Sequence, residues 1–294
     1  MQRITVLLNP RAGSRNGASA DDVTAAFRSA RCAVDVRVAD GASIVAAAVD
    51  ALKGGSNVIV AGGGDGTVSA AASVLAGTDA ALGVIPLGTL NHFSKDLGIP
   101  PGLGEAAQAI AAGRTVTVDV GDLNGRSFIN NSSVGMYASL VSERAAMERV
   151  GRGKWLAHGL AALRVWRRYR RLRVDVRGAK VEAARRVITP FVFVGNNEYQ
   201  LSGLELGGRK TLAAGRLHVC MAPGMSRRGV ARMIMAAVFG DVRTLDGFET
   251  FTAPAVTLDA GVRRLRASID GEVVTLDSPL TFRIRPRALR VIVP

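Results

Sequence analysis

Apolar and polar residues form two alternating kinds of block along the first 120 residues. Short continuous apolar runs, typical of buried strands, are followed by segments whose apolar residues recur at helical spacing. The predicted strands are 4–9, 33–38, 58–61 and 81–85, and the predicted helices are 20–30, 43–52, 68–75 and 104–112. Alternation of this kind predicts a Rossmann-like parallel α/β domain with helices on both faces of its sheet.

The pattern changes near 115–122, where strand-like blocks begin to dominate. They are predicted at 116–120, 127–131, 173–176, 188–194, 216–221, 255–258, 266–269, 272–276, 281–284 and 289–293. Two helical segments interrupt them, 139–171 (broken near 151–153) and 226–239. Many short strands separated by polar or glycine turns predict an antiparallel β-sandwich. We therefore divide the chain into an α/β domain over 1–119 and a β-sandwich domain over 120–285.

Charge adds a preference for anionic partners. The 294 residues carry a net charge of +14, and 33 arginines against 5 lysines supply the positive charge. Such a balance suits nucleic acid, an acidic membrane surface or a phosphorylated substrate. We find no helix-turn-helix, zinc-ligand or RNA-binding signature, and aromatic residues are few, so no nucleic-acid partner is expected.

The cysteines and the apolar runs bear on location. Cys32 and Cys220 lie in apolar surroundings without metal-ligand spacing, which favours core residues in a reducing compartment. No export segment opens the chain, and no apolar run approaches the roughly 20 residues that span a bilayer. We expect a cytoplasmic protein that is soluble or peripheral to the membrane.

Three unusual loops follow strands of the predicted parallel sheet. They are NPRAGS at 9–14, GGGDGT at 62–67 and PLGTLNHF at 86–93. Because ligands of such sheets bind at the carboxyl ends of the strands, we expect the three loops to form one composite site.

The middle loop has the composition of a phosphate-binding turn. Gly62, Gly63 and Gly64 would allow positive φ angles and a close approach of an anion to the backbone. Thr67 precedes the predicted helix, whose unpaired N–H groups would face that anion. Asp65 would repel phosphates unless a cation lay between, so it indicates Mg²⁺ or a hydroxyl group to be activated.

These motifs resemble the diacylglycerol kinase and sphingosine kinase catalytic family of lipid kinases. The resemblance covers most of the chain, and its markers are residues 9–14, 63–67, 86–91 and 270–272 (NPRAGS, GGDGT, PLGTLN and DGE). It implies a nucleotide-binding α/β domain, a lipid-binding sandwich, and ATP with Mg²⁺ in a cleft between them. It also implies a return of the C-terminal segment 286–294 to the first domain.

The resemblance implies two groups of site residues. The nucleotide-binding group is Asn9, Gly13, Ser14, Gly62, Gly63, Gly64, Gly66, Thr67, Gly88, Thr89, Asn91, Arg149 and Lys154. The catalytic group is Asp270, Asp65, Glu272 and Asp119. For Arg149 and Lys154, solvated surface charge is the competing interpretation.

The aspartates leave the division of roles open. One of Asp65 and Asp270 would hold Mg²⁺, and the other would accept the proton of the lipid hydroxyl. We favour Asp270 as the base, with Asp65 and Glu272 at the metal. Asp270-Gly271 also has the composition of a plain two-residue hairpin turn. Asp119 would join the network of the catalytic aspartate or simply cap a strand end.

A basic apolar segment at 154–173 bears on partners. Its arginines flank an apolar stripe, which suits a helix at an anionic membrane or an ordinary amphipathic helix packed on the sandwich. The first interpretation predicts peripheral association with the inner membrane face, where the lipid substrate lies. A homodimer stays open.

The chain departs from the family in three places. Alanines at Ala213 and Ala214 replace aspartates that support a structural Mg²⁺ in many bacterial members, so we do not carry that site over. His92 replaces a frequent aspartate, and its role is open. Ser139 and Val141 replace acids that meet a sphingoid amine, which favours a neutral lipid such as diacylglycerol or ceramide.

Three rival interpretations remain. The first is a soluble kinase of the NAD-kinase type, which shares a GGDGT motif. The second is a basic nucleic-acid-binding protein, and the third is a kinase fold without activity. The presence of both Asp65 and Asp270 argues against the third.

Overall fold

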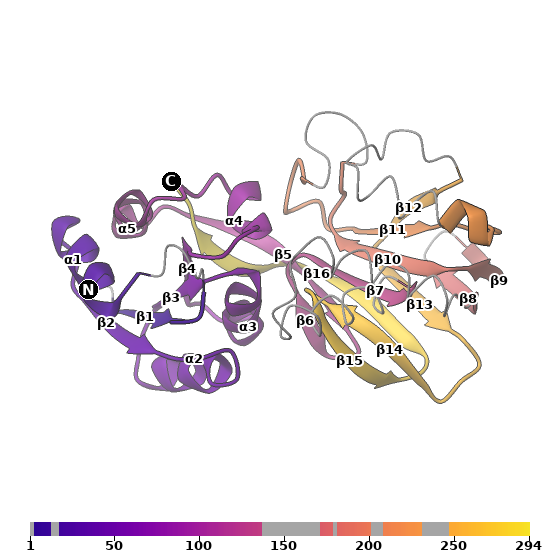
Figure 1. The fold of residues 1–294 in the computed structure, drawn as a ribbon, viewed down its shortest axis with the longest axis horizontal. Helices are drawn as coiled ribbons and strands as arrows, with labels where there is room; N and C mark the ends of the chain where they lie inside the picture. Colours follow the sequence, from indigo (N-terminus) through magenta and orange to yellow (C-terminus); the bar gives the residue numbers. More distant parts are fainter. Residues whose placement is uncertain (1–2, 13–17, 137–170, 179–180, 201–207, 231–246) are drawn as a thin grey trace.

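The computed structural model describes residues 3–12, 18–136, 171–178, 181–200, 208–230 and 247–294. Figure 1 shows an α/β half, indigo to magenta, beside a β-sandwich half that ends in yellow. Strands β5 and β16 run from one half into the other.

The α/β half follows the predicted alternation closely. Its elements are β1 (Ile4–Leu8), α1 (Ala20–Ser29), β2 (Val34–Val38), α2 (Ile44–Lys53), β3 (Val58–Gly63), α3 (Asp65–Leu75), β4 (Ala81–Pro86), α4 (His92–Asp96) and α5 (Leu103–Ala112). Strands β2, β1, β3 and β4 pair in that order, all parallel. The short helix α4 is absent from the sequence-based prediction.

Helices cover both faces of this parallel sheet, as expected. On one face α2 and α3 pack over Leu7, Ile59 and Leu82. On the other face α1 and α5 pack over Val6 and Val60. Strands β1, β3 and β4 are buried on both sides, which explains their continuous apolar runs, whereas the edge strand β2 is partly exposed.

The sandwich half contains two sheets in the part of the chain that is described. Its strands are β5 (Thr115–Leu123), β6 (Arg126–Phe128), β7 (Asn131–Gly135), β8 (Leu172–Gly178), β9 (Val181–Thr189), β10 (Phe191–Asn196), β11 (Leu217–Met221), β12 (Glu249–Ala253), β13 (Ala255–Asp259), β14 (Arg264–Ile269), β15 (Glu272–Asp277) and β16 (Leu280–Ile292). One sheet, in the order β12-β11-β10-β7-β14-β15, is antiparallel throughout. The fold class is therefore the predicted α/β domain with an antiparallel sandwich.

The other sheet is shared by both halves. It continues the parallel strands through β16, which pairs with β4 in parallel at Arg290 and Val291 and with β5 and β13 in antiparallel. The two sheets enclose a core that includes Val134, Val192 and Phe282. A strand common to both halves fixes the position of one relative to the other.

Four strand predictions are wrong in their extent. The predicted strand 127–131 is two strands, β6 and β7, in different sheets. The predicted strand 188–194 likewise covers β9 and β10, which meet at Pro190. Conversely, 281–284 and 289–293 are one long strand, β16, with an irregularity between Arg285 and Leu289.

Two predicted helices fall largely outside the described residues. Of the helix 139–171 and the basic segment 154–173, the structure describes 171–173, where Leu172 and Arg173 already belong to β8. The predicted strand at 173–176 is confirmed as part of β8, so the basic segment 154–173 is not helical at its last two residues. Of the predicted helix 226–239, the described residues end at 230. None of the helices in the described residues is long and apolar enough to span a bilayer.

Candidate active site at the junction of the two halves

The carboxyl ends of β1, β3 and β4 meet at one edge of the parallel sheet. The Asn9 amide N–H donates to the Gly62 carbonyl at 2.8 Å, and the Asn9 side chain donates to Thr67 Oγ1 at 3.0 Å. The Leu87 N–H donates to the Gly63 carbonyl at 3.0 Å. The structure thus brings together the described parts of the three loops.

Close packing of backbone accounts for glycine in these loops. A Cβ at Gly88 would lie 2.5 Å from the Gly64 Cα, and one at Gly63 would lie 2.5 Å from Thr67 Oγ1. Positive φ angles were expected at Gly62, Gly63 and Gly64, and that prediction is wrong because none of the three has one. The glycines therefore serve close approach and not an unusual backbone conformation.

Helix α3 begins three residues earlier than predicted, at Asp65. Gly64 is its N-cap and supplies no side-chain hydrogen bond, so the N–H groups of the first turn face the loops uncapped. Gly66 is exposed and Thr67 is buried, where it receives the Asn9 bond. An uncapped helix start between glycine loops fits an anionic phosphate group.

The third loop is shaped by its own asparagine. Asn91 has a left-handed backbone conformation at φ 50°, and its side chain donates to the Gly88 carbonyl at 2.8 Å and accepts from the Gly88 N–H at 3.1 Å. Thr89 and His92 are exposed on either side of it. Asn91 thus holds the loop in shape, while Thr89 and His92 are the side chains open to a ligand.

Asp270 occupies a tight turn between β14 and β15. Ile269 pairs with Glu272, and both Asp270 and Gly271 have positive φ angles, 44° and 89°. This is the two-residue hairpin geometry that the sequence allowed as an alternative. The turn carries the Asp270 carboxylate to the junction with the α/β half.

Four hydrogen bonds hold the Asp270 carboxylate. Oδ1 accepts from the N–H groups of Asn130 and Asn131, both at 2.9 Å, and Oδ2 accepts from the Ile129 N–H at 2.8 Å. We call the three consecutive N–H groups of Ile129, Asn130 and Asn131 the amide clasp. The fourth donor is Ser69 Oγ, at 2.6 Å from Oδ2.

Burial and these hydrogen bonds act on the acidity of Asp270 in opposite directions. Burial raises the pKa of the carboxyl, whereas the bonds from Ser69 and the amide clasp lower it, and the net shift is upward. A carboxylate with a raised pKa is a stronger proton acceptor than an exposed one.

Ser69 joins the two halves at this point. It lies on α3, four residues after Asp65, so the two side chains share one face of the helix. The Ser69–Asp270 bond therefore sets the two aspartates of the predicted site about one helical turn apart along α3. Sequence analysis missed Ser69 because a serine within an alanine-rich helix carries no motif.

Asp119 lies at the junction and holds two segments of the chain through its carboxylate. The residue is fully buried in β5, and its carboxylate accepts from the Gly215 N–H at 2.6 Å and from the Arg287 N–H at 2.8 Å. These bonds tie the loop before β11 and the middle of β16 to the junction. The Asp119 carbonyl also accepts from Asn196 Nδ2 at 2.9 Å, and the same nitrogen donates to the Ile129 carbonyl at 2.9 Å. Asp119 is therefore linked through Asn196 to a residue of the amide clasp, and its part in the network of the catalytic aspartate stays a prediction.

The loop with Ala213 and Ala214 is held by direct hydrogen bonds. The Ala214 N–H donates to Asn197 Oδ1 at 2.9 Å, next to the Gly215–Asp119 bond. The loop thus gains its conformation from an amide and a carboxylate of the chain itself.

The remaining predicted residues divide into two groups. Glu272 is exposed at the start of β15, directly after the Asp270 turn. Gly13, Ser14, Arg149 and Lys154 lie outside the described residues.

A magnesium ion fits this edge through few protein ligands. Asp65 is half-buried, and its carboxylate has a long 3.5 Å contact from the Phe93 N–H, which leaves acceptor capacity for a cation. The described residues contain no group of three or more acidic, histidine or cysteine side chains that could enclose a metal. A carboxylate with free acceptor capacity beside an uncapped helix start fits Mg²⁺ that also takes phosphate oxygens and water as ligands.

Two protein-family models match successive parts of the chain. Residues 3–123 match the model described as the diacylglycerol kinase catalytic domain. Residues 132–293 match the model described as the YegS C-terminal NAD kinase beta sandwich-like domain.

Individual relatives cover most of the chain. A protein named "Diacylglycerol kinase" from Mycobacterium tuberculosis is 31% identical over 262 residues, which are 87% of this chain and 82% of that protein. One named "Probable lipid kinase YegS-like" from Klebsiella pneumoniae is 28% identical over 83% of this chain and 80% of its own length. The crystal structure of a diacylglycerol kinase from Bacillus anthracis has the same fold, with a TM-score of 0.69 at 17% identity over 100% of this chain and 97% of that one.

Proposed function

The chain belongs to the family of the diacylglycerol kinase catalytic domain and the YegS-type lipid kinases, and we propose that it transfers the γ-phosphoryl group of ATP to the hydroxyl of a neutral lipid. Diacylglycerol is the first acceptor to consider, and ceramide is the second. Phosphoryl transfer requires positioning of the reactants and compensation of charge, and the junction offers both.

The α/β half would bind the nucleotide. The first turn of α3 would donate backbone N–H groups to phosphate oxygens, and Gly63, Gly64 and Gly88 allow the loops around it to pack closely. Asn9 and Asn91 keep the flanking loops in shape through their own hydrogen bonds. Asp65 would hold Mg²⁺, which when bound offsets negative charge on the phosphates.

Asp270 would accept the proton of the lipid hydroxyl. Its raised pKa and its rigid orientation by the amide clasp suit a general base. Both lone-pair regions of Oδ2 are engaged in this structure, so the lipid hydroxyl would take the place of the rotatable Ser69 hydroxyl. Glu272, next to the turn, would assist the metal.

One observation carries the proposal most directly. The Ser69–Asp270 bond at 2.6 Å brings a base from the sandwich to the helix whose first turn would bind the phosphates. Nucleotide phosphates and a lipid hydroxyl would then meet on the same face of α3.

The test is phosphate transfer from labelled ATP to lipids in mixed micelles. The acceptors are diacylglycerol, monoacylglycerol, ceramide, sphingosine and a polyprenol, with NAD as the soluble alternative. A labelled lipid that disappears with Asp270→Asn and with Asp65→Asn supports the proposal. Labelled NAD alone would establish a soluble kinase instead, and salt-sensitive DNA binding without transfer would establish the nucleic-acid alternative.

We also propose that the protein reaches its substrate by docking on anionic lipid through the basic segment 154–173. This rests on composition, because residues 154–170 lie outside the described residues. Co-sedimentation with vesicles that contain 0 or 30 mol% phosphatidylglycerol measures it, and binding that needs the anionic lipid and weakens with salt is expected, at about 1 kcal/mol for each basic residue near the surface. Equal binding to both vesicles would contradict it.

A further inference from the structure

Arg209 is a buried arginine whose guanidinium donates four hydrogen bonds. Its side chain has no exposed area, and Nε donates to Asp96 Oδ2 at 2.7 Å. Nη1 donates to the carbonyls of Ile129 and Asn196 at 2.6 and 3.1 Å, and Nη2 donates to Asn130 Oδ1 at 3.0 Å. A buried cation is tolerated only when it is paired and hydrogen-bonded, and all of these bonds run to groups that the fold holds in place.

On one side Arg209 reaches the α/β half. Asp96 is the last residue of α4, the helix that begins directly after the loop 86–91 of the nucleotide edge. Both carboxylate oxygens take part, because the Arg209 N–H donates to Asp96 Oδ1 at 3.2 Å. The pair therefore fixes α4, and the loop before it, to the segment that precedes β11.

On the other side Arg209 reaches the amide clasp. It binds the carbonyl of Ile129 and the side chain of Asn130, two of the three residues whose N–H groups hold Asp270. The third, Asn131, lies beside the Tyr199 side chain and lowers the pKa of its hydroxyl, against the larger upward effect of burial. The Arg209 guanidinium carbon lies 5.3 Å from the centre of the Tyr199 ring, which in turn packs edge-on against Phe193. Two of the three clasp residues are thus bonded directly to Arg209, and the third lies beside the tyrosine on which Arg209 stacks.

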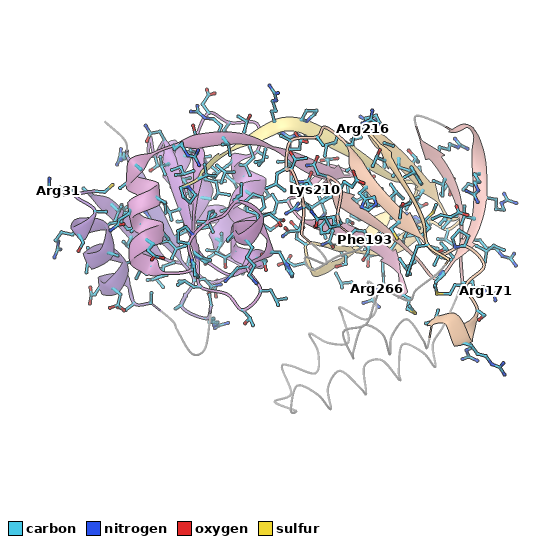
Figure 2. All side chains as sticks on the ribbon, turned by 90° about the horizontal axis from the view of Figure 1, so that it is seen from above. Arg31, Arg171, Phe193, Lys210, Arg216 and Arg266 are labelled. Atoms are coloured by element: carbon cyan, nitrogen blue, oxygen red, sulfur yellow. The ribbon has the colours of Figure 1, made fainter. Side chains whose placement is uncertain are left out.

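The location of this group agrees with a linking role. Figure 2 places Lys210, the next residue along the chain, where the two halves meet, and Phe193 on the sandwich side. Arg209 and Asp96 are 113 positions apart in the sequence, and Arg209 and Ile129 are 80 apart. One side chain connects the nucleotide edge to the support of the candidate base.

We infer that Arg209 is a positioning residue of phosphoryl transfer, which sets the nucleotide edge and Asp270 in register through Asp96 and the amide clasp. The inference rests on the proposed function and adds to it a residue that touches neither substrate. Reacting atoms must approach to about 3–3.5 Å, and a displacement of about 1 Å at such a site can cost about 100-fold in rate. Loss of Arg209 should therefore lower kcat and leave substrate binding largely in place.

The kinetic test compares Arg209→Met, Arg209→Lys and Asp96→Asn with the wild type in the lipid kinase assay. We expect kcat to fall about 10- to 100-fold in Arg209→Met and Asp96→Asn, with KM for ATP and for lipid within about threefold, because binding groups are unchanged. Arg209→Lys keeps the charge but cannot bond Asp96, Ile129 and Asn130 together, so an intermediate kcat is expected. The double variant should be no slower than Arg209→Met, since both changes break the same link.

Two controls separate positioning from loss of stability. Val176 lies in the core between the two sheets, on β8 at the far end of the sandwich. Val176→Ala therefore serves as a destabilised control for Arg209→Met that leaves the contacts of Arg209 intact. Arg186→Met breaks an exposed ion pair with Asp175. Both should keep kcat within about twofold of the wild type. If Arg209→Met retains the kcat of Val176→Ala at equal stability, or if Asp96→Asn has normal kcat, the inference is overturned.

A second measurement does not depend on the acceptor. Amide hydrogen exchange at 129–131 should accelerate at least tenfold in Arg209→Met and stay near wild type in Val176→Ala. Unchanged exchange would overturn the inference even if the lipid assay finds no substrate. If exchange accelerates in Arg209→Met but the wild type has no lipid kinase activity, the proposed function is contradicted and the link through Arg209 is still supported.

Discussion

The two aspartates of the candidate site stand in opposite surroundings. Within the described residues, the Asp65 carboxylate has one long contact, from the Phe93 N–H at 3.5 Å, at the start of an uncapped helix. The Asp270 carboxylate accepts four bonds of 2.6–2.9 Å from Ser69 and the amide clasp. The surroundings of Asp65 leave polar groups free to bind an exchangeable ligand, whereas those of Asp270 hold its carboxylate in one orientation before any ligand binds.

This difference has a physical reason. Phosphates and Mg²⁺ bind and leave with each turnover, so a site that satisfied its own donors would compete with them. A proton acceptor must instead keep one orientation relative to the transferred phosphoryl group, and preorganised donors do this without reorganisation during the reaction.

Replacing the clasped aspartate should have the largest effect. Asp270→Asn removes the proton acceptor, so kcat for lipid phosphorylation should fall about 10²- to 10⁴-fold. Steady-state kinetics measure it, with Asp277→Asn as the control, since Asp277 is exposed and pairs with Arg264 on the surface. Activity above a tenth of the wild type in Asp270→Asn would mean that the clasp holds a structural carboxylate and that the base lies elsewhere.

Replacing Asp119 tests whether this buried aspartate at the junction contributes to stability and not to the rate of phosphoryl transfer. Asp119→Ala leaves the N–H groups of Gly215 and Arg287 without their acceptor, at about 1–3 kcal/mol each. Urea unfolding should therefore show a loss of about 2–6 kcal/mol in the free energy of unfolding. The kcat of the folded fraction should stay within about threefold of the wild type, and a larger fall at full folding would return Asp119 to the catalytic group.

The nucleotide edge can be damaged by one methyl group. A Cβ in Gly88→Ala would meet the Gly64 Cα at 2.5 Å and Asn91 Oδ1 at 2.7 Å, which pushes two loops apart. Overpacking of about 1–3 kcal/mol corresponds to an ATP affinity about 5- to 100-fold lower, measured by titration calorimetry.

Gly104→Ala is the matched control for that variant. Gly104 lies in α5 with nothing within 4 Å of an added Cβ. Alanine there should stabilise the helix by about 0.5–1 kcal/mol and leave ATP affinity unchanged. Equal ATP affinity in the two variants would show that the Gly64–Gly88 approach does not shape the phosphate site.

The smallest expected effect is a pH dependence of stability that comes from His218, which is bonded to the Tyr199 backbone near the amide clasp. His218 is buried, and its Nδ1 accepts from the Tyr199 N–H at 3.1 Å. Burial lowers the pKa of His218, with Glu198 acting weakly in the opposite direction, so the unfolded chain binds the proton more readily. The contribution of His218 to stability is therefore present above about pH 6.5 and is lost as the pH falls through the lower pKa of the folded state.

Urea unfolding between pH 5 and 8 measures this contribution. The slope assigned to one proton is at most about 1.4 kcal/mol per pH unit. His218→Asn keeps an acceptor for the Tyr199 N–H and should flatten the curve below about pH 6.5. An identical pH dependence in the variant would assign the acid sensitivity to other groups.

Sequence reasoning was accurate where the signal is local. The α/β elements follow from apolar runs and helical spacing, and the three loops follow from the rule that parallel strands end at one edge. The Asp270-Gly271 turn was also readable, because adjacent positive φ angles favour this dipeptide. The comparisons with known families confirm the lipid kinase resemblance that rested on these motifs.

Sequence reasoning failed at the break between β6 and β7. Residues 127–131 have the composition of one strand, yet β6 ends at Phe128 in one sheet and β7 begins at Asn131 in the other. The turn between them exposes the N–H groups that form the amide clasp. Side-chain periodicity carries no information on which sheet a strand joins, so the support of the candidate base could not be predicted.

The sequence by itself determined most elements of the α/β half, the loops at its strand ends and the hairpin that carries Asp270, because each depends on residues a few positions apart. Only the tertiary structure decided which groups hold them. Ser69 meets Asp270 across 201 positions, and Arg209 meets Asp96 across 113. The residues that flank Ser69 and Arg209 in the sequence form no motif. Their roles arise because donors that are removed from water must be hydrogen-bonded, and the fold decides which acceptors are close.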